Sequence, residues 1–189
     1  YGTDVFKSEN ISIYFAVPTE KEKNVSRSLL LSVLKRGTES FPSQRQINER
    51  LDELYATLVN LKNQKYDGVQ LLGISADAIK QDYTNGEDIL SQALDVMGEM
   101  LLKPLFDERT GLLCEEYVST EKENYKSIIL SQINEPRTYA AIRCREEMFS
   151  SLGLIETLDG MCERIDEQTA ESLTEAYREI LESLEIVVF

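Results

Sequence analysis

Apolar and polar positions alternate near the start of the chain and then change to a helical period. Residues 11–16 alternate with a period of two, which predicts a strand with one buried face that ends at Pro18. Over 25–34 the apolar residues recur at three- and four-residue intervals, which predicts a helix with an apolar stripe. The Gly-Thr pair at 37–38 is typical of a helix end, so we expect this helix to stop there.

Turn and cap signals divide the rest of the chain into further elements. Ser43 is placed to cap a helix, the Asp-Gly pair at 67–68 predicts a hairpin turn, and Asp107 is placed to cap the element after it. The later elements are expected to be, in order, a helix with apolar positions Ile47, Leu51, Leu54 and Tyr55, strands over 58–64 and 69–76, a helix over 87–103 closed by Pro104, one long helix or two joined ones over 110–130, helices over 137–149, 153–162 and 167–181, and a strand over 185–189.

This order of elements predicts the fold class. A hairpin of strands is combined with helices that lie between and after the strands, and no Gly-rich phosphate loop or GxSxG turn is present. We therefore predict an α+β two-layer sandwich, with a mostly antiparallel sheet covered on one face by helices. The length suits a single domain over 1–189. A hydrophobic strand that stops with the chain at Phe189 leads us to expect a longer protein.

Composition narrows the possible functions. The chain contains no histidine, so imidazole cannot act as a base, a proton shuttle or a metal ligand. A formal net charge of -14 repels phosphate groups, so we expect neither nucleic acid nor a membrane surface as a partner. The apolar runs are too short to span a bilayer and no signal-peptide pattern opens the chain, which favours a cytoplasmic protein. Cys114, Cys144 and Cys162 lack CxxC spacing, so neither a disulfide framework nor a zinc knuckle is expected. We also expect no cofactor.

Several short segments of the sequence resemble the corresponding segments of one known family. They are Leu34-Lys35-Arg36-Gly37-Thr38, the run from Gly98 to Phe106 with its Lys103-Pro104 pair, the Glu121-Lys122 pair, and the segment 139–148 followed by Gly153. In this order they resemble the M16, or insulinase-like, metallopeptidases over nearly the whole chain. The resemblance implies a LuxS/M16-like metallohydrolase fold with a second, similar domain beyond Phe189. It is nearest to the first domain of the silent subunit of bacterial heterodimeric members.

The resemblance also assigns positions to the zinc site of active members. Those members have an HxxEH motif on the first helix, in which two histidines bind zinc and the glutamate acts as general base. Aligned on the Gly-Thr pair at 37–38, the three positions hold Ser28, Leu31 and Ser32. Serine hydroxyls are poor zinc ligands and leucine cannot activate water, so the resemblance implies an inactive member without catalytic or metal-binding residues. We expect Leu31 to be packed in apolar surroundings.

The third zinc ligand of active members is a glutamate on a later helix. Counting from Glu121-Lys122 places Ile128 at that position, and a shift of one turn would bring Glu123 or Glu121 there instead. One carboxylate without the histidines would still not hold a catalytic zinc ion.

Three functions are compatible with this resemblance. The first is a non-catalytic domain that pairs with an active M16 partner, as a heterodimer, to bind or enclose a peptide substrate. The second is a zinc-dependent peptidase whose site lies elsewhere in a longer chain. The third is a purely structural or regulatory interaction domain.

Overall fold

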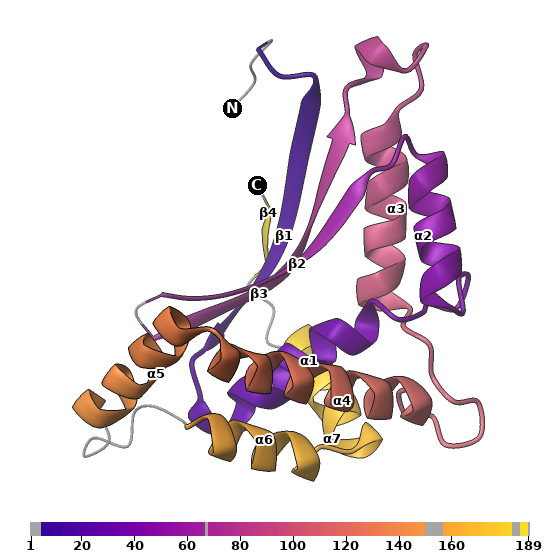
Figure 1. The fold of residues 1–189 in the computed structure, drawn as a ribbon. Helices are drawn as coiled ribbons and strands as arrows, with labels where there is room; N and C mark the ends of the chain where they lie inside the picture. Colours follow the sequence, from indigo (N-terminus) through magenta and orange to yellow (C-terminus); the bar gives the residue numbers. More distant parts are fainter. Residues whose placement is uncertain (1–4, 67, 150–156, 183–185, 189) are drawn as a thin grey trace.

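The structure is a computed structural model that describes residues 5–66, 68–149, 157–182 and 186–188 (Figure 1). Three short 3-10 turns, η1 (Lys21–Lys23), η2 (Gln81–Tyr83) and η3 (Gln132–Asn134), lie between the main elements. In chain order the strands and α-helices are β1 (Ser8–Pro18), α1 (Asn24–Leu34), α2 (Gln44–Glu53), β2 (Leu58–Tyr66), β3 (Val69–Ile79), α3 (Ile89–Leu102), α4 (Glu115–Ser131), α5 (Pro136–Phe149), α6 (Leu158–Glu167), α7 (Ala170–Glu182) and β4 (Ile186–Val188).

The described strands form one sheet in the order β2-β3-β1-β4, and each pairing is antiparallel. Ile13 of β1 pairs with Ile74 of β3 on one side and with Val188 of β4 on the other. Figure 1 shows the helices gathered against this sheet as a second layer. The predicted α+β sandwich with a mostly antiparallel sheet is therefore confirmed.

The predicted hairpin is formed by β2 and β3. Their pairing runs from Leu58 opposite Asp77 to Tyr66 opposite Val69, while Asp67 of the predicted turn lies outside the described residues. Gly73 lies in the middle of β3, where an added Cβ atom would stand 2.2 Å from the carbonyl oxygen of Ile13. A glycine is needed at this point because the neighbouring backbone comes too close for any side chain.

Two apolar clusters stabilise the fold, and α1 contacts both. The larger cluster lies between the sheet and the helices α1, α2, α3 and α7, whereas the smaller one joins the start of α1 to α4, α5 and α6. The helix α1 accordingly packs against α4, α6 and α7. Fully buried members of the larger cluster include Leu29, Leu30, Leu72, Met97 and Leu173, and the smaller cluster consists of Val25, Ile129, Ile142, Leu158 and Ile165.

Two sequence-based expectations about helix ends are wrong. The helix expected over 110–130 begins at Glu115, because Asp107 caps a turn instead of this helix. The Asp107 carboxylate accepts hydrogen bonds from the backbone N–H groups of Arg109 and Thr110, which lower its pKa. Tyr55 does not lie on the apolar side of α2, since the helix ends before it and its side chain is exposed.

The segment expected as a helix over 153–162 also differs. The helix α6 begins at Leu158, with the Thr157 side chain accepting a hydrogen bond from the backbone N–H of Gly160, and residues 153–156 lie outside the described part. Within the described ranges, no helix combines the length and apolar character that a bilayer crossing requires.

Candidate functional site

The three positions that the resemblance aligns with the HxxEH motif lie on α1. Residues at i, i+3 and i+4 share one side of a helix, so Ser28, Leu31 and Ser32 point in broadly the same direction. Ser28 and Ser32 are half-buried, whereas Leu31 is only 4% exposed. This side of α1 therefore presents two hydroxyl groups and one hydrocarbon side chain.

The hydroxyl group of Ser28 links α1 to β2. Ser28 Oγ donates to the carbonyl oxygen of Asn24 at 2.7 Å and accepts from Asn63 Nδ2 at 2.6 Å. The single hydroxyl proton is thus used within the helix, and the Asn63 amide occupies one of the acceptor sites.

Leu31 packs into the larger apolar cluster, on the side of α1 that faces α7. It lines a small apolar gap together with Phe15, Leu101 and Tyr177. The expectation that Leu31 is packed in apolar surroundings is therefore confirmed. Complete burial of such a side chain contributes about 1.5–3 kcal/mol to stability.

The helix α4 supplies the candidates for the third position, and it runs antiparallel to α1. Arg36, just beyond the end of α1, forms an ion pair with Glu121 near the start of α4. At the opposite end of the contact, Ser28 and Ile128 line the same cavity. Glu121 is therefore engaged with Arg36 at the far end of α1 from Ser28.

Ile128 and Glu123 lie on different parts of α4. The side chain of Ile128 is 58% exposed and forms part of the cavity wall beside Ser28. Glu123 lines a separate, shallow hollow with Lys126 and Asn134. Of the three candidates for the third position, Ile128 is the one that shares a cavity with Ser28.

Tyr125 is a residue of this site that counting along the sequence missed. It lies one turn before Ile128 on the same side of α4, lines the cavity and packs against both apolar clusters. The helical spacing from Glu121 through Tyr125 to Ile128 would have indicated which side of α4 faces α1.

The cavity beside Ser28 has a volume of about 430 Å³ and lies between the start of α1, the end of β2, and the helices α4, α5 and α6. Three of its lining residues are cationic, and none of the described lining residues is acidic. The cationic residues are Lys21, Lys65 and Arg145; the others are Asn24, Val25, Ser28, Tyr125, Ile128, Ile129, Gln132, Ile142, Leu158 and Met161.

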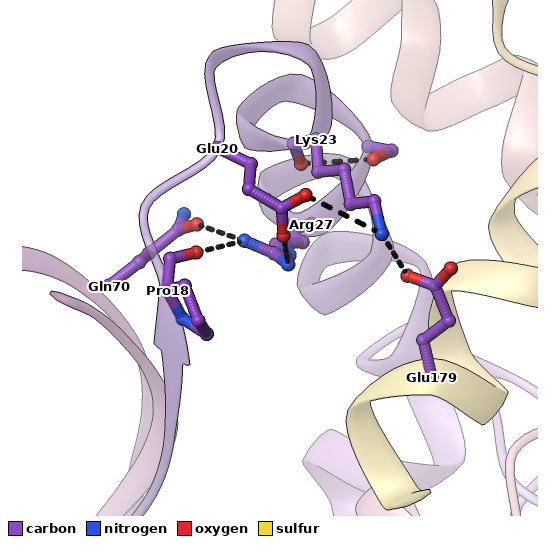
Figure 2. A network of polar contacts seen from close by, with 7 residues as sticks. Pro18, Glu20, Lys23, Arg27, Gln70 and Glu179 are labelled. Atoms are coloured by element: carbon purple, nitrogen blue, oxygen red, sulfur yellow. Dashed lines mark hydrogen bonds and ion pairs between the residues drawn. The ribbon is translucent and has the colours of Figure 1, made fainter. Parts of the chain in front are cut away.

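A buried arginine on the neighbouring side of α1 fixes the helix to the sheet (Figure 2). The Arg27 side chain is 6% exposed, and its guanidinium donates to the carbonyl oxygen of Pro18 at 2.7 Å and to Glu20 Oε1 at 2.8 Å. Lys23 extends the network by donating to Glu179 of α7 at 2.8 Å, and this hydrogen bond raises the pKa of the Lys23 ammonium. The network thus joins the end of β1, α1 and α7.

Comparison with curated proteins gives one informative relative. The chain is 25% identical over 181 residues to the Bacillus subtilis (strain 168) protein named probable inactive metalloprotease YmfF. The alignment covers 95% of this chain and 42% of the relative. This chain is similar to a probable inactive metalloprotease. No family model matches it.

Solved structures of other proteins share the fold of this chain. A conserved protein from Enterococcus faecalis V583 superimposes with a TM-score of 0.84 at 25% identity, over 98% of this chain and 44% of that one. A protease from Helicobacter pylori superimposes with a TM-score of 0.63 at 16% identity, over 98% of this chain and 41% of that one. The chain therefore spans less than half the length of these proteins.

The side chains at the aligned positions do not fit a zinc ion. In the alignment that the resemblance gives, two hydroxyl groups and the hydrocarbon side chain of Leu31 stand where imidazole and carboxylate groups would be needed, and Leu31 is turned into the core. Within the described residues, no group of three or more Cys, Asp or Glu side chains gathers where it could hold a metal ion. The side chains of Ser28, Leu31 and Ser32 therefore provide no metal-dependent step.

Two of the segments that resemble the family, around Gly37-Thr38 and Lys103-Pro104, lie side by side in the structure. The backbone of Thr38 pairs with that of Pro104, Glu39 N–H donates to the carbonyl oxygen of Lys103 at 3.0 Å, and Leu105 N–H donates to that of Gly37 at 3.2 Å. A Cβ atom on Gly37 would stand 2.7 Å from the carbonyl oxygen of Pro42, so glycine suits this crowded turn. The two segments thus pair through their backbones and hold the ends of α1 and α3 together.

Proposed function

We propose that this chain is a non-catalytic peptidase-like domain of a longer protein, which pairs with an active M16 partner and helps to bind or enclose its peptide substrate. The observation that carries the proposal is the similarity to a probable inactive metalloprotease over 95% of the chain. The absence of histidine from the chain supports it, because none of these residues can supply the imidazole ligands of an HxxEH zinc site.

The surroundings of the aligned positions support the same proposal. At the place of the general base stands a buried leucine, which can neither take up nor release a proton. On the α4 side of α1, the cavity beside Ser28 provides apolar walls together with amide and hydroxyl groups, which are features that can hold a peptide.

The proposal is tested on the full-length protein, purified from its own cells through an affinity tag. We expect three results: no stoichiometric zinc by elemental analysis, no cleavage of a quenched fluorescent peptide library by the protein alone, and co-purification of a protein with an HxxEH motif. The matched control is a strain in which the glutamate of that partner's motif is changed to glutamine. In the control, the complex should still assemble but the peptidase activity of the preparation should disappear.

Two outcomes would contradict the proposal. Stoichiometric zinc together with chelator-sensitive cleavage by the isolated protein would show that the longer chain is itself a peptidase. A full-length protein that stays monomeric in the presence of the partner and binds no peptide would favour a purely structural or regulatory domain.

A further inference from the structure

The helix α5 is the least buried α-helix in the part of the chain that the structure describes. Of its 14 residues Ile142 and Glu146 are buried and Phe149 is half-buried, whereas eight of the 11 residues of α1 are buried. Figure 1 shows α5 at the edge of the molecule, at the left of the view. A helix of this length is only marginally stable in water by itself, so its position depends on a few contacts.

The first of these contacts is apolar and is made by Ile142. Its side chain belongs to the smaller apolar cluster, together with Val25 of α1, Ile129 of α4 and Leu158 of α6. The larger cluster, between the sheet and the other helices, contains no residue of α5. The core of the domain can therefore stay intact when α5 leaves its place.

The second contact is polar and is made by Glu146. The Glu146 side chain is 7% exposed, and its Oε1 atom accepts a hydrogen bond from the backbone N–H of Leu158, the first residue of α6, at 3.3 Å. This N–H group has no partner within α6, and the helix dipole favours a carboxylate there. Glu146 therefore attaches α5 to the start of α6.

The chain has a suitable hinge at the start of α5. The turn η3 ends at Asn134, Glu135 has an extended backbone, and Pro136 opens α5. Because Pro136 has no N–H group, it cannot donate a hydrogen bond back to η3. A change of backbone angles at Glu135 would thus change the direction of α5, as terminal residues of elements do in known hinges.

The cavity beside Ser28 uses α5 as one of its walls, through Ile142 and Arg145. Detachment of α5 would open this wall and expose apolar side chains to water, so the closed position is the more stable one. We propose that α5 is a movable wall of the cavity, which detaches from α6 and the smaller cluster while the rest of the domain stays folded. This inference goes beyond the proposed function and is independent of what enters the cavity.

The test is native-state hydrogen exchange of the full-length protein, followed by mass spectrometry. A detached α5 loses its helical hydrogen bonds, since it is marginal without tertiary contacts. We therefore expect amides over 138–148 to exchange about a hundredfold or more faster than those over 29–34 in α1. Their exchange should depend little on urea, because such a local opening exposes little surface.

Variants at the two contacts should shift this opening. Ile142→Ala and Glu146→Ala should each speed exchange over 138–148 by about tenfold while leaving exchange over 29–34 unchanged. The matched control is Met148→Ala, which shortens an apolar side chain of the same helix that is 65% exposed. The control should leave exchange in both segments within about twofold of the wild type.

A thiol placed in the cavity wall reports whether the opening uncovers the cavity. Ile129 of α4 is 4% exposed and lines the cavity, whereas Leu29 of α1 is fully buried and does not line it. Each is changed to cysteine in a full-length protein whose other cysteines are replaced by serine. Adding Ile142→Ala should speed maleimide labelling of the Ile129→Cys protein by about tenfold and leave that of the Leu29→Cys protein unchanged.

Three results would overturn the inference. Exchange over 138–148 as slow as that over 29–34 would show that α5 is fixed. Exchange that rises equally over 138–148 and over 158–167 in the Ile142→Ala variant would show that the whole smaller cluster opens instead of α5. Labelling of the Ile129→Cys protein that does not respond to Ile142→Ala would show that α5 loses its hydrogen bonds without opening the cavity.

Discussion

Ser28 and Leu31 are neighbours on α1, but their surroundings assign them different roles. Ser28 lies at the wall of a cavity and links two elements through its hydroxyl group, whereas Leu31 is packed against α7 and the sheet. In the alignment that the resemblance gives, an active peptidase would need water at the second of these positions. In this chain the same position contributes to the stability of the core instead.

This difference at the residue scale can be measured with Leu31→Glu. The substitution should lower the free energy of unfolding by about 3–5 kcal/mol, because the core offers a buried carboxylate no partner and the packing of leucine is lost. Urea-induced unfolding followed by circular dichroism is the measurement. Leu31→Met is the control and should cost less than about 1.5 kcal/mol. Equal stabilities of the glutamate and methionine variants would show that position 31 is open to solvent.

The ends of the elements show what local sequence can and cannot predict. Ser43 caps α2 with the reciprocal bonds of a capping box, and Pro136 opens α5, because both signals act through backbone groups a few residues away. The start of α4 could not be predicted in this way. It is set by a bridge between Phe106 and Leu113 and by a hydrogen bond from Leu113 N–H to Thr174 of α7.

The candidate site shows the same limit. The positions on α1 come from the resemblance to a known family, and the composition already excluded imidazole. Tyr125 and the cations Lys65 and Arg145 come from other elements, and only the packing of those elements around the start of α1 brings them together. The resemblance therefore assigned positions on α1, whereas the cavity beside them could not be predicted from the sequence.

The polar network around Arg27 holds elements together, so its loss should lower the stability of the fold. Arg27→Met should lower the free energy of unfolding by about 1–3 kcal/mol, because the carbonyl oxygen of Pro18 loses a charged donor inside the protein. Arg45→Met is the matched control, since the Arg45 side chain is 86% exposed and its pair with Glu49 lies on the surface. The control should stay within about 0.5 kcal/mol of the wild type. Similar losses in both variants would mean that Arg27 does not join β1 to α1.

At the scale of the whole molecule, the dominant electrostatic feature is an excess of negative charge. The net charge of -14 is distributed over the chain, and mutual repulsion among like charges opposes the compact state.

The repulsion predicts how salt affects stability. Raising the ionic strength from about 0.01 M to about 0.15 M shortens the screening length from about 30 Å to about 8 Å, so the melting temperature should rise. Scanning calorimetry in NaCl and in KCl checks this, and the two salts should act alike. A melting temperature that falls with salt would mean that attractive ion pairs outweigh the repulsion.

The pairing of β4 with β1 has a consequence for how the chain folds during synthesis. Tyr14 is made before all the helices described above, whereas its partner Val187 is made only after them. Until then, one edge of β1 has unpaired backbone groups that can associate with another nascent chain. Contacts between such distant residues also slow folding, because the intervening chain must first be ordered. The edge of β1 that β4 covers is therefore open to association until translation has passed β4.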